Sequence, residues 1–180
     1  LSASYDELIS VPGVGEQVAL YLMCVGKCVE KGNNARFFAS FSNRGDIYDF
    51  VKLRMRGHTS ERLELYFIDK GGKLMRISRF TSGESDMVRV QPEEVIKLVS
   101  VIHPYAMVAA HNHPGGTSRP SVTDDDFTKQ CQIICSMNNV RLYDHVIYAS
   151  EEDIYSYFDS GKLDEIERDY SIRNLIKHEE

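Results

Sequence analysis

The short apolar run from Tyr105 to Ala110 most constrains the fold, because such runs are typical of strands buried inside a sheet. Before it, Pro92 stands at a first helical position and apolar residues recur at helical spacing up to Ile102. After it, residues 112–120 form a loop rich in Pro and Gly. The run therefore predicts a central strand that delivers His111 at its end, where sites on mixed sheets usually lie.

The rest of the chain alternates predicted helices with predicted strands. Leu63–Asp69 and Leu74–Phe80 form a predicted hairpin around Gly71 and Gly72. The other expected elements are helices over residues 4–10, 16–30, 47–56 (capped by Asp46), 121–137 (capped by Ser121 or Thr123) and 162–177, a tight turn over 11–15, and strands over 140–149 and 154–158. Helices that interleave with strands indicate an α/β or α+β class.

The composition is that of an ordinary globular protein. The 180 residues suit one domain or one domain with a small appendage, and they are 42% hydrophobic and 27% charged. The net charge of −6 gives no support to a surface coated in basic patches. We find no apolar run that could span a bilayer and no signal peptide, which indicates a cytoplasmic protein without a membrane partner. The first residue is Leu1 rather than Met, as expected of a fragment whose native N-terminus is missing.

The four cysteines form two pairs at helical spacing, Cys24 with Cys28 and Cys131 with Cys135. Structural zinc sites usually use tighter Cys-x2-Cys knuckles, so a four-thiolate metal site is not favoured. We expect all four to be reduced cysteines packed in the core, which also suits the cytoplasm.

A candidate metal site lies in the loop and helix start that follow the central strand. His111, His113 and Asp124 offer two imidazoles and a carboxylate, and catalytic zinc usually takes three protein ligands and keeps a fourth position for water. Asp125 and Asp126 are alternative carboxylate ligands, or acids that favour a helix start. The pattern predicts a zinc hydrolase.

Such a hydrolase also needs a base and a group that stabilises the oxyanion. Glu61, just before the strand that begins at Leu63, is the predicted base. Its rival Glu64 falls, by the alternation of apolar residues, on the strand surface. Ser121 is predicted to donate to the oxyanion, to cap the helix, or to do both.

These residues, taken in order, resemble the JAMM motif of zinc metallopeptidases and isopeptidases, and most closely the RadC family. The motifs that carry the resemblance are Asp46-Ile47-Tyr48, Glu61-Arg62-Leu63 through Ile68-Asp69, Pro92-Glu93-Glu94, His111-Asn112-His113-Pro114-Gly115-Gly116, Ser121-x2-Asp124, and Leu142-Tyr143-Asp144-His145. Gly115 stands where the family usually has Ser.

The resemblance implies a fold, a ligand set and a function. The implied fold is an α/β mixed sheet flanked by helices, of the MPN type and similar to cytidine deaminases. The implied zinc ligands are His111, His113 and Asp124, with Glu61 as the base and Ser121 at the oxyanion. A peptide or protein substrate is implied, together with the family's traditional association with DNA repair. The expected domains are a hairpin unit over 1–32, a linker over 33–45, the zinc domain over 46–160 and a terminal helix over 161–180.

Four further polar residues lie near these motifs, and two of them allow two interpretations. Asp144 and His145 are either a pair that orients a metal ligand or a packed pair on a strand. His58 and His103 are predicted to be structural.

The segment from Leu8 to Ala19 resembles the helix-hairpin-helix motif of DNA-binding proteins. Its turn contains Gly13 and Gly15, and such a turn can direct backbone N–H groups at a phosphate. Residues 1–31 are net acidic, however, whereas non-specific DNA binding usually depends on several basic contacts. The hairpin unit is therefore either a DNA-contacting unit or a module that packs within the protein or binds a partner.

Two function classes follow from the sequence. The first is a zinc hydrolase of peptide or isopeptide bonds. The second is a nucleic-acid-associated module or nuclease that uses the hairpin. A deaminase is disfavoured because His113 stands where those enzymes have Glu, and no Cys-x2-Cys follows. The sequence indicates neither the substrate nor the oligomeric state.

Overall fold

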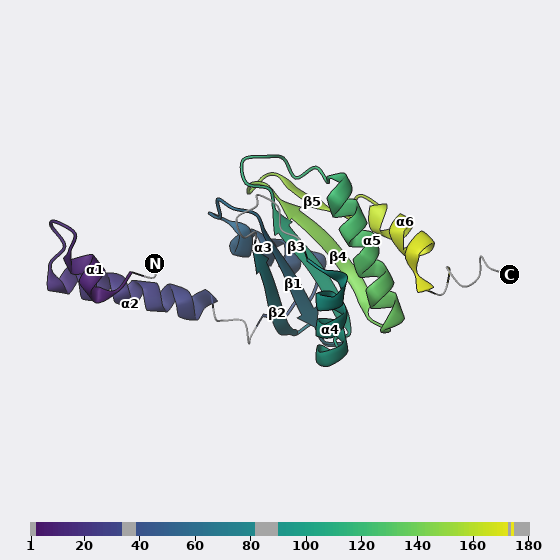
Figure 1. Cartoon of the computed structure of the whole chain (residues 1–180), viewed down its shortest axis with the longest axis horizontal. Coiled ribbons are helices and arrows are strands. Elements are labelled where there is room, and N and C mark those ends of the chain that lie inside the picture. The colour runs from purple at the N-terminus through teal and green to yellow at the C-terminus, as the bar shows by residue number, and fades with distance from the viewer. Residues whose placement is uncertain (1–2, 34–38, 82–89, 173, 175–180) are drawn as a thin grey trace. The chain divides into compact units, whose positions relative to one another are not determined.

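The computed structural model describes residues 3–33, 39–81, 90–172 and 174, without the side chains of residues 27–33 (Figure 1). The chain divides into two compact units, residues 1–39 and 40–180. Within the described part of the chain, we find no helix that is both long and apolar enough to cross a membrane.

The first unit is a pair of helices joined by a tight turn. Helix α1 (Tyr5–Ile9) is capped by Ser4, whose side chain accepts from the Glu7 N–H while the Glu7 carboxylate accepts from Ser4. Helix α2 (Glu16–Asn33) follows, and the two helices contact each other. Gly13 has a φ of +89°, a conformation that favours glycine, as expected for the turn.

The second unit is built on a five-stranded mixed sheet. The strands are β1 (Arg62–Ile68), β2 (Leu74–Thr81), β3 (Ala106–Asn112), β4 (Arg141–Tyr148) and β5 (Ile154–Ser156), in the order β2-β1-β3-β4-β5. Strands β3 and β4 are parallel, and the other neighbours are antiparallel. A parallel pair needs a crossover, which α5 (Val122–Met137) supplies.

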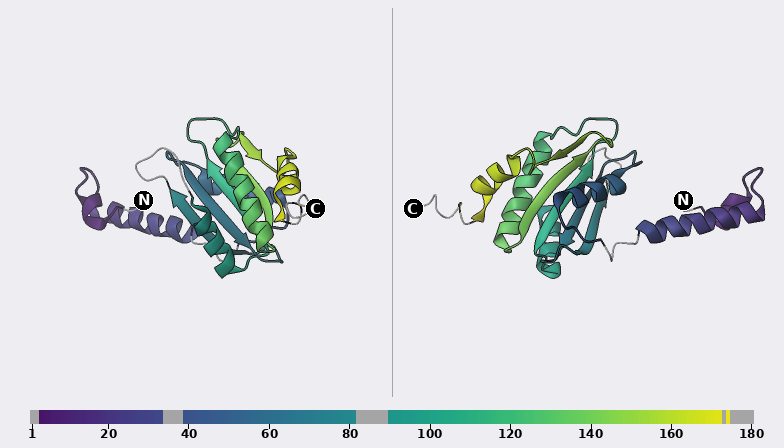
Figure 2. Two further views of the ribbon diagram at one scale, coloured as in Figure 1. Left: turned by 45° about the vertical axis from the view of Figure 1, so that its right-hand side comes forward. Right: turned by 180° about the vertical axis from the view of Figure 1, so that it is seen from behind.

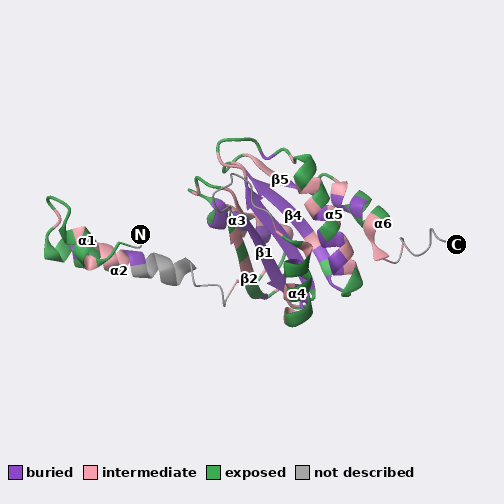
Figure 3. Cartoon of the chain, viewed as in Figure 1, coloured by how far each residue is buried: buried purple, intermediate pink, exposed green. Residues whose placement is uncertain are grey.

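Helices cover both faces of this sheet (Figures 1 and 2). On one face, α4 (Pro92–Ile102), α5 and α6 (Lys162–Tyr170) close the main core. The core residues of these helices include Val95, Val99, Ile134, Leu163 and Ile166. On the other face lies α3 (Arg44–Met55). Strand β3 is therefore buried throughout and β1 from Leu63 onward (Figure 3), and the α/β class is confirmed.

Most predicted elements are present, with shifted ends. The cap of α3 is Asn43 rather than Asp46, whose carboxylate instead accepts from the Asn43 N–H to complete the capping box. Helix α6 ends at Tyr170 because Ser171 is extended, and the predicted end at 177 lies outside the described residues.

The cysteine prediction is correct for only part of the chain. Cys131 and Cys135 are buried and carry free thiols, whereas Cys24 is also free but exposed, contrary to expectation. Val18, Leu20 and Tyr21 of the same helix are exposed as well. The Cys28 side chain lies outside the described residues.

The prediction that Glu64 lies on the strand surface is wrong. Glu64 is 0% exposed, because α3 covers its face of the sheet. Arg54 of α3 donates to its carboxylate from Nε at 3.0 Å and Nη2 at 2.6 Å. The Tyr66 hydroxyl at 3.1 Å and Arg79 Nε at 3.0 Å also donate to it. Alternation separates the two faces of a strand, but it does not reveal whether a distant helix covers one of them.

Candidate metal centre

One end of the sheet gathers the predicted ligands from β3 and α5. His111 and Asn112 are the last residues of β3, and the His113 N–H donates to the Tyr148 carbonyl at 2.9 Å. The loop then turns back through Gly115, at a φ of +70°. Ser121 caps α5, which places Asp124 in the first turn beside the histidines.

The three side chains meet at a single point. His111 Nε2 lies 2.8 Å from His113 Nε2 and 3.1 Å from Asp124 Oδ1, and His113 Nε2 lies 3.5 Å from Asp124 Oδ2. Contact with Asp124 raises the pKa of His113 above its usual value. Burial alone would raise the pKa of Asp124, but the two imidazoles hold it well below its usual range.

The donors themselves fit a cation. His113 Nδ1 is 2.8 Å from the Thr117 carbonyl oxygen, which only accepts, so Nδ1 carries the proton and Nε2 of the neutral ring keeps a lone pair. Two imidazole nitrogens and a carboxylate directed at one point repel one another unless a cation lies between them. Neutral nitrogens with one carboxylate suit zinc.

The three adjacent aspartates at the start of α5 have different partners. Asp124 faces the histidines. Asp125 accepts from the Tyr157 hydroxyl at 2.8 Å and from Lys162 Nζ at 2.6 Å, which ties α6 to α5. Asp126 pairs with Lys129 on the surface of the same helix. Only Asp124 of the three is grouped with His111 and His113.

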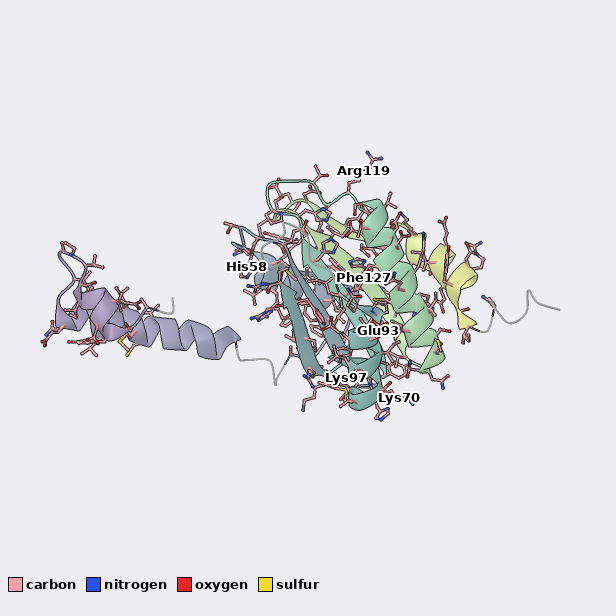
Figure 4. The ribbon with its side chains drawn as sticks, viewed as in Figure 1. His58, Lys70, Glu93, Lys97, Arg119 and Phe127 are labelled. Atoms are coloured by element: carbon pink, nitrogen blue, oxygen red, sulfur yellow. The ribbon has the colours of Figure 1, made fainter. Side chains whose placement is uncertain are left out.

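A cleft of about 890 Å³ opens onto this centre. Its lining includes Glu61, Ser121, His111, His113, Asp124, Arg119 and Phe127, so every predicted ligand and catalytic residue borders one space. Figure 4 shows Arg119 beyond the start of α5 and Phe127 nearer the strands. Leu63, the second residue of β1, pairs with His111, and Glu61 stands just before that strand. The Glu61 charge contributes to the raised pKa of His113.

Ser121 acts here as a helix cap. Its hydroxyl accepts from the Asp124 N–H at 3.2 Å and donates to Asp124 Oδ2 at 2.7 Å. The proton that an oxyanion would need is therefore directed at Asp124.

Asn112 is a positioning residue that the sequence reasoning missed. It lies between the two histidines but points to the opposite face of β3, because side chains alternate along a strand. Its Oδ1 accepts from the Arg62 N–H at 2.8 Å, and its Nδ2 donates to the Ser60 carbonyl at 3.1 Å. These two bonds hold the backbone on both sides of Glu61. The one sequence signal for Asn112 is its position between the two histidines, because alternation along a strand directs its side chain away from theirs.

The predicted pair Asp144 and His145 is divided between the two faces of β4. The Asp144 carboxylate accepts from Tyr48 of α3 at 3.1 Å and from Ser156 at 2.7 Å. His145 Nε2 lies 2.9 Å from His111 Nδ1. Burial raises the pKa of Asp144, whereas burial together with the His111 charge holds the pKa of His145 well below its usual value.

The two histidines predicted to be structural and the two glycines of the hairpin turn lie outside this cleft lining. His58 borders a second cavity, and His103 ends α4 in the left-handed conformation with a φ of +49°. Gly13 and Gly15 lie in the turn between α1 and α2, in the first unit.

Comparison with known proteins agrees with this arrangement. The chain is similar to a UPF0758 protein of Dechloromonas aromatica, 27% identical over 163 residues that cover 89% of this chain and 72% of the relative. It is also similar to a UPF0758 protein of Acidovorax sp. strain JS42, 29% identical over 151 residues that cover 83% of this chain and 63% of the relative. A UPF0758 protein of Legionella pneumophila is 26% identical over 164 residues, which cover 90% of this chain and 72% of the relative.

A match to a known protein family covers most of the larger unit. Residues 41–162 match the RadC-like JAB domain, a segment that holds the whole sheet, helices α3 to α5 and every residue of the metal centre. The mixed sheet flanked by helices is the JAB/MPN fold. The chain therefore belongs to the family of proteins with a RadC-like JAB domain.

Proposed function

We propose that this protein is a zinc-dependent hydrolase that cleaves a peptide or isopeptide bond. The observation that carries the proposal is the meeting of His111, His113 and Asp124 at the end of a cleft that Glu61 also borders. The donor atoms fit zinc, and a carboxylate close to the centre supplies the base that hydrolysis needs. Membership of a JAB family supports the same chemistry.

The residues would divide the reaction among them. Zinc held by His111, His113 and Asp124 would supply Lewis-acid chemistry, acidifying water and polarising a carbonyl oxygen. Glu61 would take a proton from the attacking water and then deliver it to the leaving nitrogen. Asn112 would hold the backbone on both sides of Glu61, because it bonds to Ser60 and Arg62.

Ser121 has a conditional role in this scheme. Its hydroxyl proton is directed at Asp124 Oδ2, so it would have to turn toward the cleft to donate to an oxyanion. The capping bond from the Asp124 N–H does not use that proton and can persist while the hydroxyl turns.

The metal assignment is tested by replacing one ligand. Purified wild type should contain about one zinc per chain, and His113→Ala should contain little, because removing one of three ligands opens the site. Zinc is measured by elemental analysis beside hydrolysis of a mixed peptide library. His103→Asn is the matched control, since it removes an exposed imidazole outside the cleft, and Asn tolerates the left-handed backbone there. A zinc content in His113→Ala equal to that of wild type would show that His113 is not a zinc ligand.

DNA contact through the first unit is the second candidate. The paired helices and the positive φ of Gly13 support a hairpin that can direct N–H groups at a phosphate. If this unit binds DNA, affinity should fall as salt rises and should be lost when residues 1–32 are removed. Fluorescence anisotropy with a short duplex measures both effects. Binding that is insensitive to salt, or unchanged in the shortened chain, would exclude this role.

A further inference from the structure

His145 is a buried polar residue that the proposed reaction leaves without a role. It is 0% exposed, and its ring stacks on Tyr157 at 4.8 Å between centroids with an interplanar angle of 9°. The Tyr157 hydroxyl is held by Asp125, and Phe127 contacts the His145 ring edge-on. The plane of the His145 imidazole is therefore fixed by its neighbours, so its two nitrogens have fixed partners.

The direction of the hydrogen bonds around His145 follows from a backbone carbonyl. Thr128 Oγ1 lies 2.6 Å from the Asp124 carbonyl oxygen, one turn earlier in α5. A carbonyl only accepts, so the Thr128 hydroxyl proton must be directed at it. Thr128 Oγ1 also lies 2.6 Å from His145 Nδ1. Because the hydroxyl proton is already used, His145 Nδ1 must carry a proton and donate to Thr128.

The protonation of His145 also decides which nitrogen of His111 carries a proton. A neutral imidazole carries one proton, so protonation of His145 at Nδ1 leaves Nε2 as an acceptor. His111 Nδ1, 2.9 Å from that Nε2, must then donate. His111 in turn keeps its lone pair on Nε2, the atom that faces His113 Nε2 and Asp124 Oδ1. Complete burial favours the neutral form of His145.

We propose that His145 and Thr128 are positioning residues that fix His111 in the tautomer whose Nε2 is free to bind a metal. The bonds run from His111 to His145, then to Thr128 and the Asp124 carbonyl, so they join one ligand to the backbone of another. Metal-binding histidines more often donate to a carboxylate, carbonyl or water. An imidazole acceptor adds no negative charge, so Asp124 remains the one anionic ligand of the three and the bound cation keeps more of its charge.

Thr128 offers a matched pair of substitutions. Thr128→Val keeps the shape but removes the acceptor for His145, whereas Thr128→Ser keeps the hydroxyl. We expect Thr128→Val to bind zinc about 10–100-fold more weakly than wild type, and Thr128→Ser to bind within about threefold. Zinc affinity is measured by competition with a chromophoric chelator, after urea unfolding has shown that both variants fold. Equal affinity in folded Thr128→Val and Thr128→Ser would overturn the proposal.

A second measurement uses the wild type alone. Proton–nitrogen correlations of the imidazole rings should show His145 protonated at Nδ1 and not at Nε2, with and without zinc. A proton on His145 Nε2 would overturn the proposal even if Thr128→Val fails to fold. The zinc readout rests on the proposed function, but this one does not. Wild type that binds no zinc would refute the hydrolase, while the ring spectra would still decide the tautomer.

Discussion

Glu61→Gln should lower hydrolysis of the peptide library by about 10²–10⁴-fold while the zinc content stays at the wild-type value. Gln has almost the same shape as Glu, but its amide cannot take a proton from water at neutral pH. Glu61 borders the same cleft as His113 and is not one of the three grouped ligands, so its loss should affect proton transfer and not metal binding. Rates are compared at equal zinc loading, so a metal defect cannot mimic the result.

Asp126→Asn is the control for this change. Asp126 borders the same cleft and loses the same charge, but it pairs with Lys129 and does not face the histidines. We expect hydrolysis by Asp126→Asn to stay within about threefold of wild type, since surface ion pairs contribute little. Zinc-loaded Glu61→Gln that cleaves as fast as this control would remove Glu61 from the reaction.

Glu64→Gln should destabilise the fold by about 3–5 kcal/mol, because it leaves buried cations without their counter-charge. Glu64 is fully buried, Arg54 is nearly so, and Arg79 and Arg62 lie 3.0 Å and 3.9 Å from the same carboxylate oxygen. The measurement is urea unfolding followed by circular dichroism. Glu151→Gln breaks the exposed pair of Glu151 with Arg56 and serves as the control, for which we expect little change.

The same group predicts how stability depends on pH. Burial alone would raise the pKa of Glu64, but hydrogen bonds and charge from Arg54 and Arg79 bring it below the usual value of 4.5. A carboxyl whose pKa is lower in the folded protein stabilises the fold above its unfolded pKa, and that contribution is lost as pH falls through the folded pKa. Wild type should therefore lose stability below about pH 4.5 more steeply than Glu64→Gln. Parallel acid unfolding curves would show that Glu64 is not the group responsible.

The ligand cluster was largely predictable because most of it is local in sequence. His111 and His113 are two residues apart at a strand end, and Asp124 lies in the first turn of the next helix, so short-range geometry brings them together. Glu61 was predictable because it directly precedes β1, which pairs with the strand of His111. The partners of Asp125 were not predictable, since Lys162 reaches Asp125 from a helix far along the chain.

By itself, the sequence determined the α/β class, most helices and strands, and the closeness of His111, His113 and Asp124, because periodicity, caps and motif spacing are local properties. Only the tertiary structure decided what surrounds them. Alternation assigns Glu64, Asp144 and His145 to faces of their strands. Helices α3 and α5, however, supply partners that these side chains bond to once they are buried. A buried polar group needs a hydrogen-bond partner, and here those partners come from elements distant in sequence.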